Sequence, residues 1–171
     1  MGREIRRVPL EWQHPKKMYP DHRNGRMRED YQPLYDRDYP TACAEWKKGF
    51  AEWESSERQA HLQEYGEDIE FWDWDGMPPD QEYYHPAWTE TERSGYAVYE
   101  TVSEGTPVTP TFATKEGLID YLVKNGDYWD QSRGVGGWNR ANAEAFVERE
   151  WAPSGVFNVA TGEFKTAREG A

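Results

Sequence analysis

Apolar and polar positions follow regular periods mainly in the C-terminal part of the chain. Residues 96–102 alternate in a way that predicts a strand, and a turn at 104–107 followed by residues 108–113 predicts its hairpin partner. Thr114 is a good helix N-cap, and Asn125-Gly126 is a typical helix end. The helix predicted between them buries one apolar face, formed by Leu118, Tyr121 and Leu122.

The remaining C-terminal residues predict a loop, a helix and a closing hairpin. Residues 127–137 are predicted to be the loop, and the helix over 139–151 would bury Ala143, Phe146 and Val147. Short strands at 156–159 and 163–165 predict the hairpin. We therefore expect an α+β fold in which residues 95–171 form a compact unit of two hairpins and two short helices.

The first 94 residues are less regular. Closely spaced prolines predict that residues 1–40 form an extended, Pro-rich basic arm. Thr41 is predicted to cap an amphipathic helix over about 41–65, because rings recur on one face of it: Trp46, Phe50 and Trp53. An irregular segment rich in rings and acids completes the region 41–94. We expect these regions and the C-terminal unit to form one cooperative domain.

Composition changes this picture in two ways. A mean hydropathy of -1.08 is polar for a folded protein, but nine Trp, eleven Tyr and six Phe predict a core built largely from rings. Cys43, the one cysteine, excludes an intrachain disulfide and is expected to be a small buried thiol. No apolar stretch follows the basic first residues or approaches the ~18 apolar residues of a membrane span, so we expect a cytoplasmic protein without a membrane partner.

The net charge of -12 is concentrated in the middle of the chain. Residues 45–104 contain sixteen acids and four bases, whereas residues 1–44 carry +2 and residues 105–171 carry -2. Such a block repels nucleic acid and attracts basic surfaces. Residues 1–28 are the exception, because eight bases interleaved with Trp12 and Tyr19 could grip phosphates and stack on bases. The alternative is that this basic arm folds onto the acidic block of its own chain.

Motifs for metal binding and catalysis are weak. His14, His22, His61 and His85 form no pair at helical spacing, and Cys43 has no local activator. Asp73, Asp75 and Asp80 invite a calcium interpretation, but their spacing does not fit a calcium loop. The glycine loop 134–137 precedes a helix without the lysine or the last glycine of the nucleotide motifs. The sequence thus favours a non-enzymatic protein without metal or cofactor.

Three segments between residues 96 and 154 follow the pattern YxxYETxSEGTPxSP…TxExLxxxL…AFVxxxWAPS, with Thr109 where the pattern has serine. In this pattern the chain resembles a group of uncharacterised bacteriophage proteins, and its opening residues 1–15 are similar to the start of many phage proteins of unknown function. After the final Ala-Pro-Ser, relatives tend to have an aliphatic pair, whereas this chain has Gly155-Val156-Phe157. The resemblance implies a phage or prophage origin and location in the infected bacterial cytoplasm, but no catalytic residue.

Rings embedded in the acidic block predict a protein-binding surface. Trp46, Trp53, Phe71, Trp72, Trp74, Tyr83, Tyr84 and Trp88 would anchor a partner inside a charged rim, or would simply supply the core. An acidic surface of this kind can also occupy the nucleic-acid groove of a basic partner. The residues predicted to bind are Trp72, Asp73, Trp74 and Asp75, with rim charges Glu67, Asp68 and Glu70.

These observations predict a phage accessory protein that inhibits a host defence or nucleic-acid-handling complex, with DNA mimicry of the anti-CRISPR kind as one way of doing so. Its partner would be a basic host or phage protein or nucleoprotein complex. Two alternatives remain open. One is a small nucleotide-metabolising or modifying enzyme whose residues gather in the fold, including His85, Asp127 and the glycine loop. The other is a virion or assembly component.

Overall fold

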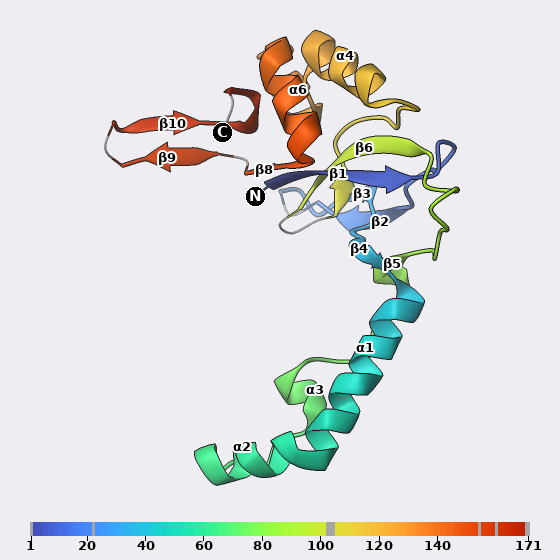
Figure 1. Ribbon diagram of the computed structural model, residues 1–171, viewed down its shortest axis with the longest axis vertical. Helices are drawn as coiled ribbons and strands as arrows, with labels where there is room; N and C mark the ends of the chain where they lie inside the picture. Colours follow the sequence, from blue (N-terminus) through green and yellow to red (C-terminus); the bar gives the residue numbers. More distant parts are fainter. Residues whose placement is uncertain (1, 22, 102–104, 154, 160, 170–171) are drawn as a thin grey trace. The chain divides into compact units, whose positions relative to one another are not determined.

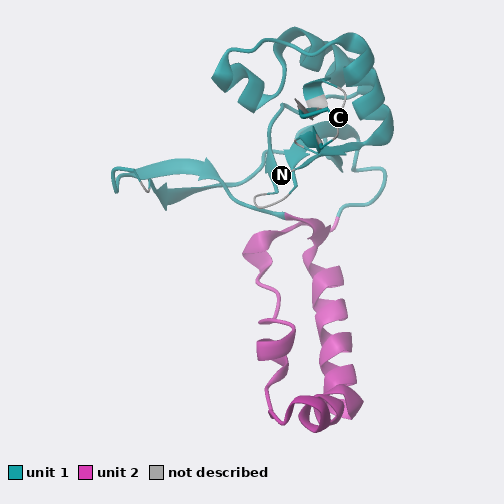
Figure 2. Ribbon diagram, turned by 90° about the vertical axis from the view of Figure 1, so that its left-hand side faces the viewer, with its two compact units in different colours: residues 1–34, 88–171 teal, residues 35–87 magenta. Residues whose placement is uncertain are grey.

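The computed structural model describes residues 2–21, 23–101, 105–153, 155–159 and 161–169 (Figure 1). Contacts within the chain divide it into two compact units, shown in Figure 2: unit 1 comprises residues 1–34 and 88–171, and unit 2 comprises residues 35–87. The predicted α+β class is confirmed. The predicted division after residues 40 and 94, within one cooperative domain, stays a prediction.

A four-stranded antiparallel sheet in the order β7-β6-β1-β8 forms the centre of unit 1. Its strands are β1 (Gly2–Val8), β6 (Gly95–Glu100), β7 (Thr106–Pro107) and β8 (Trp151–Pro153). β1 pairs with β6 on one side and with β8 on the other. Its sequence shows no alternating apolar run, because two of its buried positions are occupied by Arg3 and Arg6. For this reason the sequence did not predict a central strand here.

Two helices cover one face of this sheet, α4 (Lys115–Asn125) and α6 (Arg140–Arg149) (Figure 1). The short helix α5 (Tyr128–Arg133) lies between them in the sequence. The Thr114 hydroxyl accepts a hydrogen bond from the Gly117 backbone, which confirms the predicted cap of α4. The shared core is mostly aliphatic and consists of Val98, Val108, Leu118, Ile119, Leu122, Trp138, Ala143, Phe146, Val147 and Ala152.

Two details of the predicted C-terminal unit are wrong. The expected loop over 127–137 contains α5, because Asp127 and Asp130 cap each other's backbone N–H in a capping box. In the expected strand over 108–113 the pairing consists of an isolated bridge between Tyr96 and Phe112, since Pro110 interrupts the ladder, and the paired strand β7 lies in residues that were expected to be a turn. Residue 104 of the predicted turn lies outside the described residues.

Two hairpins extend unit 1. The first pairs β2 (Lys16–Pro20) with β3 (Met27–Tyr31). The second pairs β9 (Val156–Asn158) with β10 (Glu163–Lys165), which confirms the predicted closing hairpin, and a 3-10 turn follows at Ala167–Glu169. The face of the central sheet away from the helices packs Val8, Ala97 and Tyr99 against Trp12 and Trp88.

Unit 2 begins and ends with two short parallel strands, β4 (Tyr35–Asp38) and β5 (Tyr84–His85). Between them lie α1 (Tyr39–Glu52), a π-helical turn (Trp53–Glu57), α2 (Arg58–Tyr65), α3 (Phe71–Trp74) and a 3-10 turn (Gln81–Tyr83). The predicted helix over 41–65 is confirmed in extent, with the π turn in its middle. Across the described part of the chain, no helix is both long enough and apolar enough to cross a membrane.

Candidate protein-binding surface

Stacked rings form the interior of unit 2. Trp46 stacks on Phe50 at 5.5 Å between ring centroids, and Phe71 meets both rings edge-on. Gly49 permits this approach, since a Cβ atom there would lie 3.1 Å from Phe71 Cζ. The Trp46 indole donates a hydrogen bond to Gly76 O at 3.0 Å. The ring face predicted for the helix is therefore in part the core of the unit.

A second row of rings runs from this interior to the surface. Trp53 is 1% exposed and stacks on Trp74 at 5.4 Å, while His61 lies edge-on to Trp74 and tilted against Tyr65. Trp74 is 54% exposed and Tyr65 is 61% exposed. We call Trp53, His61, Tyr65 and Trp74 the ring row. One end of it is buried and the other is open to solvent.

The π turn gives the ring row an unusual base. Trp53 is its first residue, and among the described residues no acceptor lies within hydrogen-bond distance of the Trp53 indole nitrogen. A buried donor without an acceptor costs about 1–3 kcal/mol. π turns occur frequently at functional sites, where the surrounding structure offsets such a cost.

Arg58 holds three carboxylates beside the ring row. Its guanidinium lies 2.7 Å from Asp68, 3.3 Å from Glu54 and 3.4 Å from Glu70. The hydrogen bond from Arg58 lowers the pKa of Asp68, and the bond to Asp68 raises the pKa of Arg58. Two of the predicted rim residues, Asp68 and Glu70, thus belong to an ion-pair cluster.

The other predicted acidic residues are exposed charges without a base. Glu67, Asp73 and Asp75 are exposed, and within the described residues none of their carboxylates lies in an ion pair. The backbone carbonyl of Glu67 accepts a hydrogen bond from His61 Nδ1 at 3.1 Å, which ties this loop to the ring row. Trp72 is 45% exposed. Five of the seven predicted residues are therefore exposed and outside the Arg58 cluster: Glu67, Trp72, Asp73, Trp74 and Asp75.

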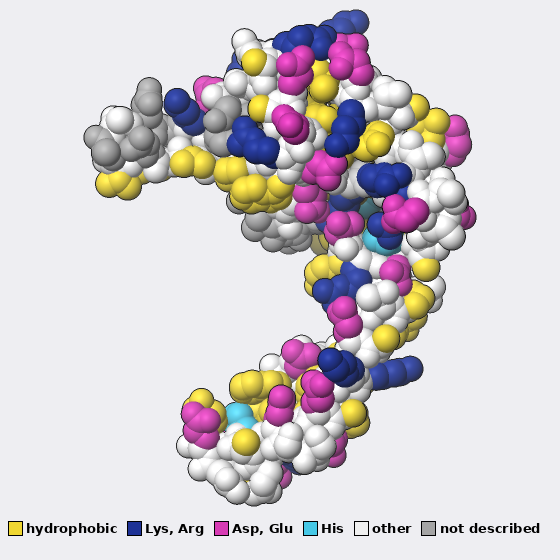
Figure 3. Space-filling model, viewed as in Figure 1, with side chains coloured by type: hydrophobic (Ala, Val, Ile, Leu, Met, Phe, Trp, Pro, Cys, Tyr) yellow, Lys and Arg dark blue, Asp and Glu magenta, His cyan; other side chains and the backbone are white. Residues whose placement is uncertain are grey.

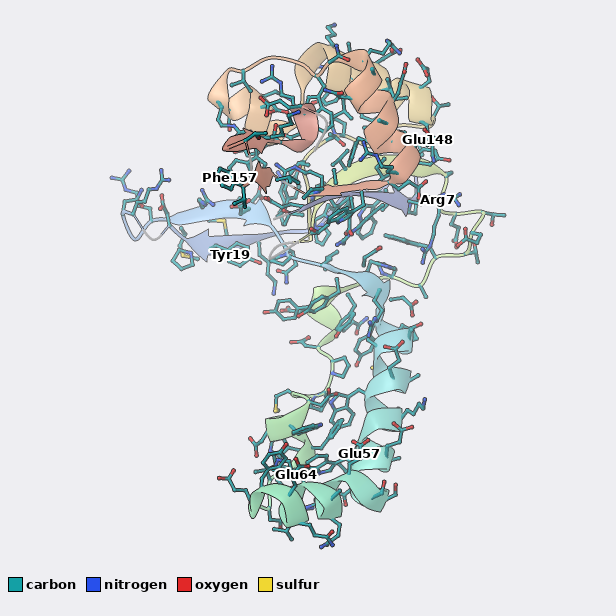
Figure 4. All side chains as sticks on the ribbon, turned by 60° about the vertical axis from the view of Figure 1, so that its left-hand side comes forward. Arg7, Tyr19, Glu57, Glu64, Glu148 and Phe157 are labelled. Atoms are coloured by element: carbon teal, nitrogen blue, oxygen red, sulfur yellow. The ribbon has the colours of Figure 1, made fainter. Side chains whose placement is uncertain are left out.

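Sequence reasoning missed part of this surface. Glu57 and Glu64, labelled in Figure 4, are exposed on the π turn and α2. The Tyr65 phenol donates to the Glu64 carboxylate, and this hydrogen bond raises the pKa of Tyr65. A spacing of four residues could have predicted this part of the surface, because such a spacing brings side chains to one face of a helix. The residues at this spacing are Trp53, Glu57, His61 and Tyr65.

Charge is distributed unequally between the two units. Unit 2 contains fourteen acids and four bases, a net charge of -10, whereas unit 1 contains eighteen acids and sixteen bases, a net charge of -2. Twelve of the fourteen acids in unit 2 are exposed. Figure 3 shows acidic side chains beside hydrophobic ones at the α2 end of unit 2. Rings and carboxylates therefore share this surface.

The comparisons with known proteins add no family. No protein-family model, no curated protein and no solved structure matches this chain. The resemblance to phage proteins stays a prediction, and parts of its pattern, including residues 102–104 and 154, lie outside the described residues.

Other rings of the acidic block have mixed positions. Trp46 and Tyr84 are half-buried in unit 2, and Tyr83 is 44% exposed. Trp88 belongs to unit 1, where it packs edge-on against Trp12 at 4.9 Å. Some of these rings therefore belong to the core, as Trp46 does, and others are exposed as a binding surface requires, as Tyr83 is.

The residues of the enzyme alternative are separated between the units. His85 is buried in unit 2 and donates from Nδ1 to Pro86 O, whereas Asp127 is buried in unit 1 and accepts from Arg3 Nε at 2.7 Å. The glycine loop also belongs to unit 1. A Cβ atom on Gly137 would lie 1.9 Å from Val123 O, so close backbone contact explains this glycine without a nucleotide.

Arg3 joins a buried polar network in unit 1. It lies 3.4 Å from Glu100, and the Trp129 indole donates to the same carboxylate at 3.0 Å. The Trp138 indole donates to Asp130 Oδ2 at 2.6 Å, beside the capping box. Arg3, Glu100, Asp127 and Asp130 are thus all engaged in ion pairs or in the cap of α5. They hold α5 against the central sheet.

The remaining metal candidates have local structural partners. Asp80 caps the 3-10 turn by accepting from Glu82 N, and a hydrogen bond with the half-buried Cys43 thiol raises the pKa of Tyr39. His22 lies outside the described residues. Among the residues that the structure does describe, no group of three or more histidine, cysteine, aspartate or glutamate side chains could hold a metal ion.

His14 occupies a buried polar site in unit 1. Its Nε2 donates to Gln32 O at 2.6 Å, and its Nδ1 lies 3.3 Å from the Tyr99 hydroxyl. Burial lowers the pKa of His14 from 6.5 to about 4, the Arg6 charge also lowers it, and the hydrogen bond to Gln32 opposes both. His14 is therefore neutral in the folded protein near pH 7.

Proposed function

We propose that this chain is a phage-encoded, non-enzymatic binding protein whose unit 2 docks on a basic protein of the host and inhibits the defence or nucleic-acid-handling complex to which that protein belongs. The observation that carries the proposal is the combination, on one small unit, of a half-exposed ring row and a net charge of -10. The phage origin rests on the sequence resemblance.

Charge selects the class of partner. Carboxylates without a paired base speed the approach of a positively charged surface and repel an acidic one. Glu57, Glu67, Asp73 and Asp75 are exposed carboxylates of this kind in unit 2. Basic proteins that bind nucleic acid present arginine and lysine in the surfaces that such carboxylates can occupy. A basic protein surface is therefore the occupant to which we commit.

The ring row provides the affinity. Tryptophan and tyrosine are the commonest residues at the energetic centres of protein interfaces, because they bury a large area with few rotatable bonds. Trp74 and Tyr65 are more than half exposed, yet each contacts His61 and so is held in place before binding. Arginine side chains of a partner can also stack on these ring faces.

The matched experiment compares two double charge reversals. Asp73→Lys/Asp75→Lys removes two exposed carboxylates beside the ring row, and Glu11→Lys/Glu148→Lys makes the same net change on unit 1 (Figure 4). Both variants and the unchanged protein are immobilised and exposed to bacterial lysate. A retained protein is identified by mass spectrometry, purified and titrated against each variant at low and high salt.

We expect the Asp73/Asp75 variant to bind the purified partner at least tenfold more weakly, and the Glu11/Glu148 variant to bind it normally. The expected difference shrinks at high salt, since screening weakens the long-range attraction. Equal binding by the two variants would remove the physical basis of the proposal. A retained protein with an acidic binding surface would do the same.

A further inference from the structure

The β2–β3 hairpin is mostly exposed to solvent, yet its two strands are regularly paired. Eight of its ten strand residues are exposed, and the pairing runs without a bulge from Lys16 and Tyr31 to Pro20 and Met27. Figures 2 and 4 both show the hairpin extending away from the rest of unit 1, with Tyr19 labelled in Figure 4. Tyr19 anchors it by donating to Gln32 Oε1 at 2.8 Å.

Hydrogen bonds order the tip of this hairpin. Asp21 N donates to Arg26 O at 2.8 Å, and Gly25 N donates to Asp21 O at 2.7 Å. Gly25 has a φ of +69°, a conformation that glycine adopts without strain. The Asp21 carboxylate accepts from Arg23 N and from the Asn24 amide, so its acceptors are used inside the turn.

Two arginines leave this turn without a carboxylate partner. Arg23 and Arg26 are exposed, and in the described part of the chain neither guanidinium forms an ion pair. By contrast, Lys16 lies 3.2 Å from Glu29, and Arg28 pairs with Asp30. Over residues 16–31 the hairpin has five bases and three acids, a net charge of +2 on a protein of -12.

Three of the exposed side chains between root and tip are apolar or aromatic. Met18 is 55% exposed, Met27 is 56% exposed and Tyr31 is 37% exposed. Their positions in the register place these three residues on the same face of the ribbon. The hairpin thus combines a positive tip with a face on which these three side chains lie beside the Lys16–Glu29 ion pair. Free guanidinium groups bind phosphate, and methionine can contact thymine methyl groups and sugars.

We propose that the β2–β3 hairpin binds duplex DNA, with the ribbon in the major groove and with Arg23 and Arg26 on backbone phosphates. A major groove about 12 Å wide admits a two-stranded β-ribbon, whereas the major groove of duplex RNA is deep and narrow. This inference is independent of the proposed function, because it concerns unit 1 and uses none of the residues of the ring row.

The net negative charge of the protein is compatible with this contact. Most of that charge belongs to unit 2, and unit 1 carries only -2. Exposed charges more than about 10 Å apart are largely screened at 0.1 M salt. A local positive tip can therefore bind phosphates at moderate ionic strength, with an affinity that falls as salt rises.

The test measures binding of the full chain to a fluorescent 20-base-pair DNA duplex by anisotropy, at several salt concentrations. Arg23→Gln/Arg26→Gln removes the two tip charges. Lys124→Gln/Arg149→Gln is the matched control, because it removes two exposed positive charges elsewhere in unit 1 that form no ion pair with a described residue. An RNA duplex of the same sequence and a single strand are measured in parallel.

We expect the Arg23/Arg26 variant to lose about 50-fold in affinity at 0.1 M salt, and the slope of log affinity against log salt to fall by about two, since each phosphate contact contributes about 0.9 to it. The control variant should lose little. Equal losses in both variants, no DNA binding at 0.1 mM protein, or equal or tighter binding of duplex RNA or single strands would each overturn the proposal.

Discussion

The two units of this chain bury apolar surface in different ways. Unit 1 has a mostly aliphatic core between a sheet and helices α4 and α6, in which Leu118, Leu122 and Val98 are fully buried. In unit 2, all of whose residues are described, only Ala42, Trp53, Phe71 and His85 are buried. The rings of unit 2 serve as interior and surface at once. A unit with so few buried residues opens more readily, so we expect unit 1 to hold most of the stability.

Charge follows the same division. Unit 1 pairs charges in its interior, as between Arg3 and Asp127, whereas unit 2 keeps its carboxylates at the surface. Breaking a buried pair is costly, and changing exposed charges costs little. Mutations of charged residues should therefore affect folding in unit 1 and binding in unit 2.

The largest expected effect comes from Trp53→Ala. Truncating this buried ring should destabilise unit 2 by about 3–5 kcal/mol, because it leaves a cavity under Trp74. Native-state hydrogen exchange should show lost protection in α1 and α2 and retained protection in α4 and α6. Loss of protection in both units together would mean that they unfold as one and would remove the contrast between them.

Arg3→Leu should destabilise unit 1 by roughly 3–4 kcal/mol, since Glu100 and Asp127 would stay buried without their cation. Denaturant unfolding followed by far-ultraviolet circular dichroism measures the change. Arg7→Leu is the control: Arg7 lies on the same strand as Arg3, and its ion pair with Glu90 is exposed. Breaking this pair should lower the free energy of unfolding only slightly. Similar losses in the two variants would contradict the proposed role of burial.

His14 should make unit 1 sensitive to mild acid. Its pKa is lower in the folded protein than in the unfolded one, so its contribution is complete above pH 6.5 and is lost as pH falls toward 4. After allowance for partial exposure to solvent, the loss between pH 7 and 4.5 is about 1–2 kcal/mol. Urea unfolding of His14→Gln should show a smaller decrease over this range.

Unit 2 offers the contrast in the same experiment. Asp68 has a lowered pKa beside Arg58, so its contribution is present above its ordinary pKa of 3.8 and is lost only at lower pH. The mild-acid decrease should therefore appear in exchange protection of unit 1. An equal decrease in unit 2 between pH 7 and 4.5 would show that other groups control the response.

Arg58→Gln should have the smallest effect. Its ion pairs with Glu54, Asp68 and Glu70 are exposed, so we expect a small fall in melting temperature that disappears at high salt. Calorimetry at two salt concentrations measures it. A large fall that persists at high salt would place Arg58 among the residues on which the fold of unit 2 depends.

Periodic patterns predicted part of this molecule and failed where inward positions are polar. The helix after Thr114 and the ring face of Trp46, Phe50 and Trp53 follow standard helical spacing and were predicted. β1 was not, because Arg3 and Arg6 become core residues only when distant carboxylates and carbonyls meet them. Local spacing carries no information about such partners.

The candidate surface was predicted at the level of a segment. Trp72, Asp73, Trp74 and Asp75 are exposed, but His61 and Tyr65 join the ring row from another helix. Asp68 and Glu70 were predicted as rim charges, and their partner Arg58 was not recognised. The contacts between α2 and the segment around α3 determine which of these residues are exposed and which are paired. Those contacts form only because the chain turns back between α2 and α3.

The central place of β1 has a consequence for synthesis on the ribosome. Its neighbours come from residues 95–100 and 151–153, so this strand must wait until residue 153 has been made before its sheet is complete. Residues 35–87 are continuous and can acquire their helices while that strand is still unpaired. Unit 2, with its rings and carboxylates, can therefore fold early, whereas the central sheet of unit 1 is completed later.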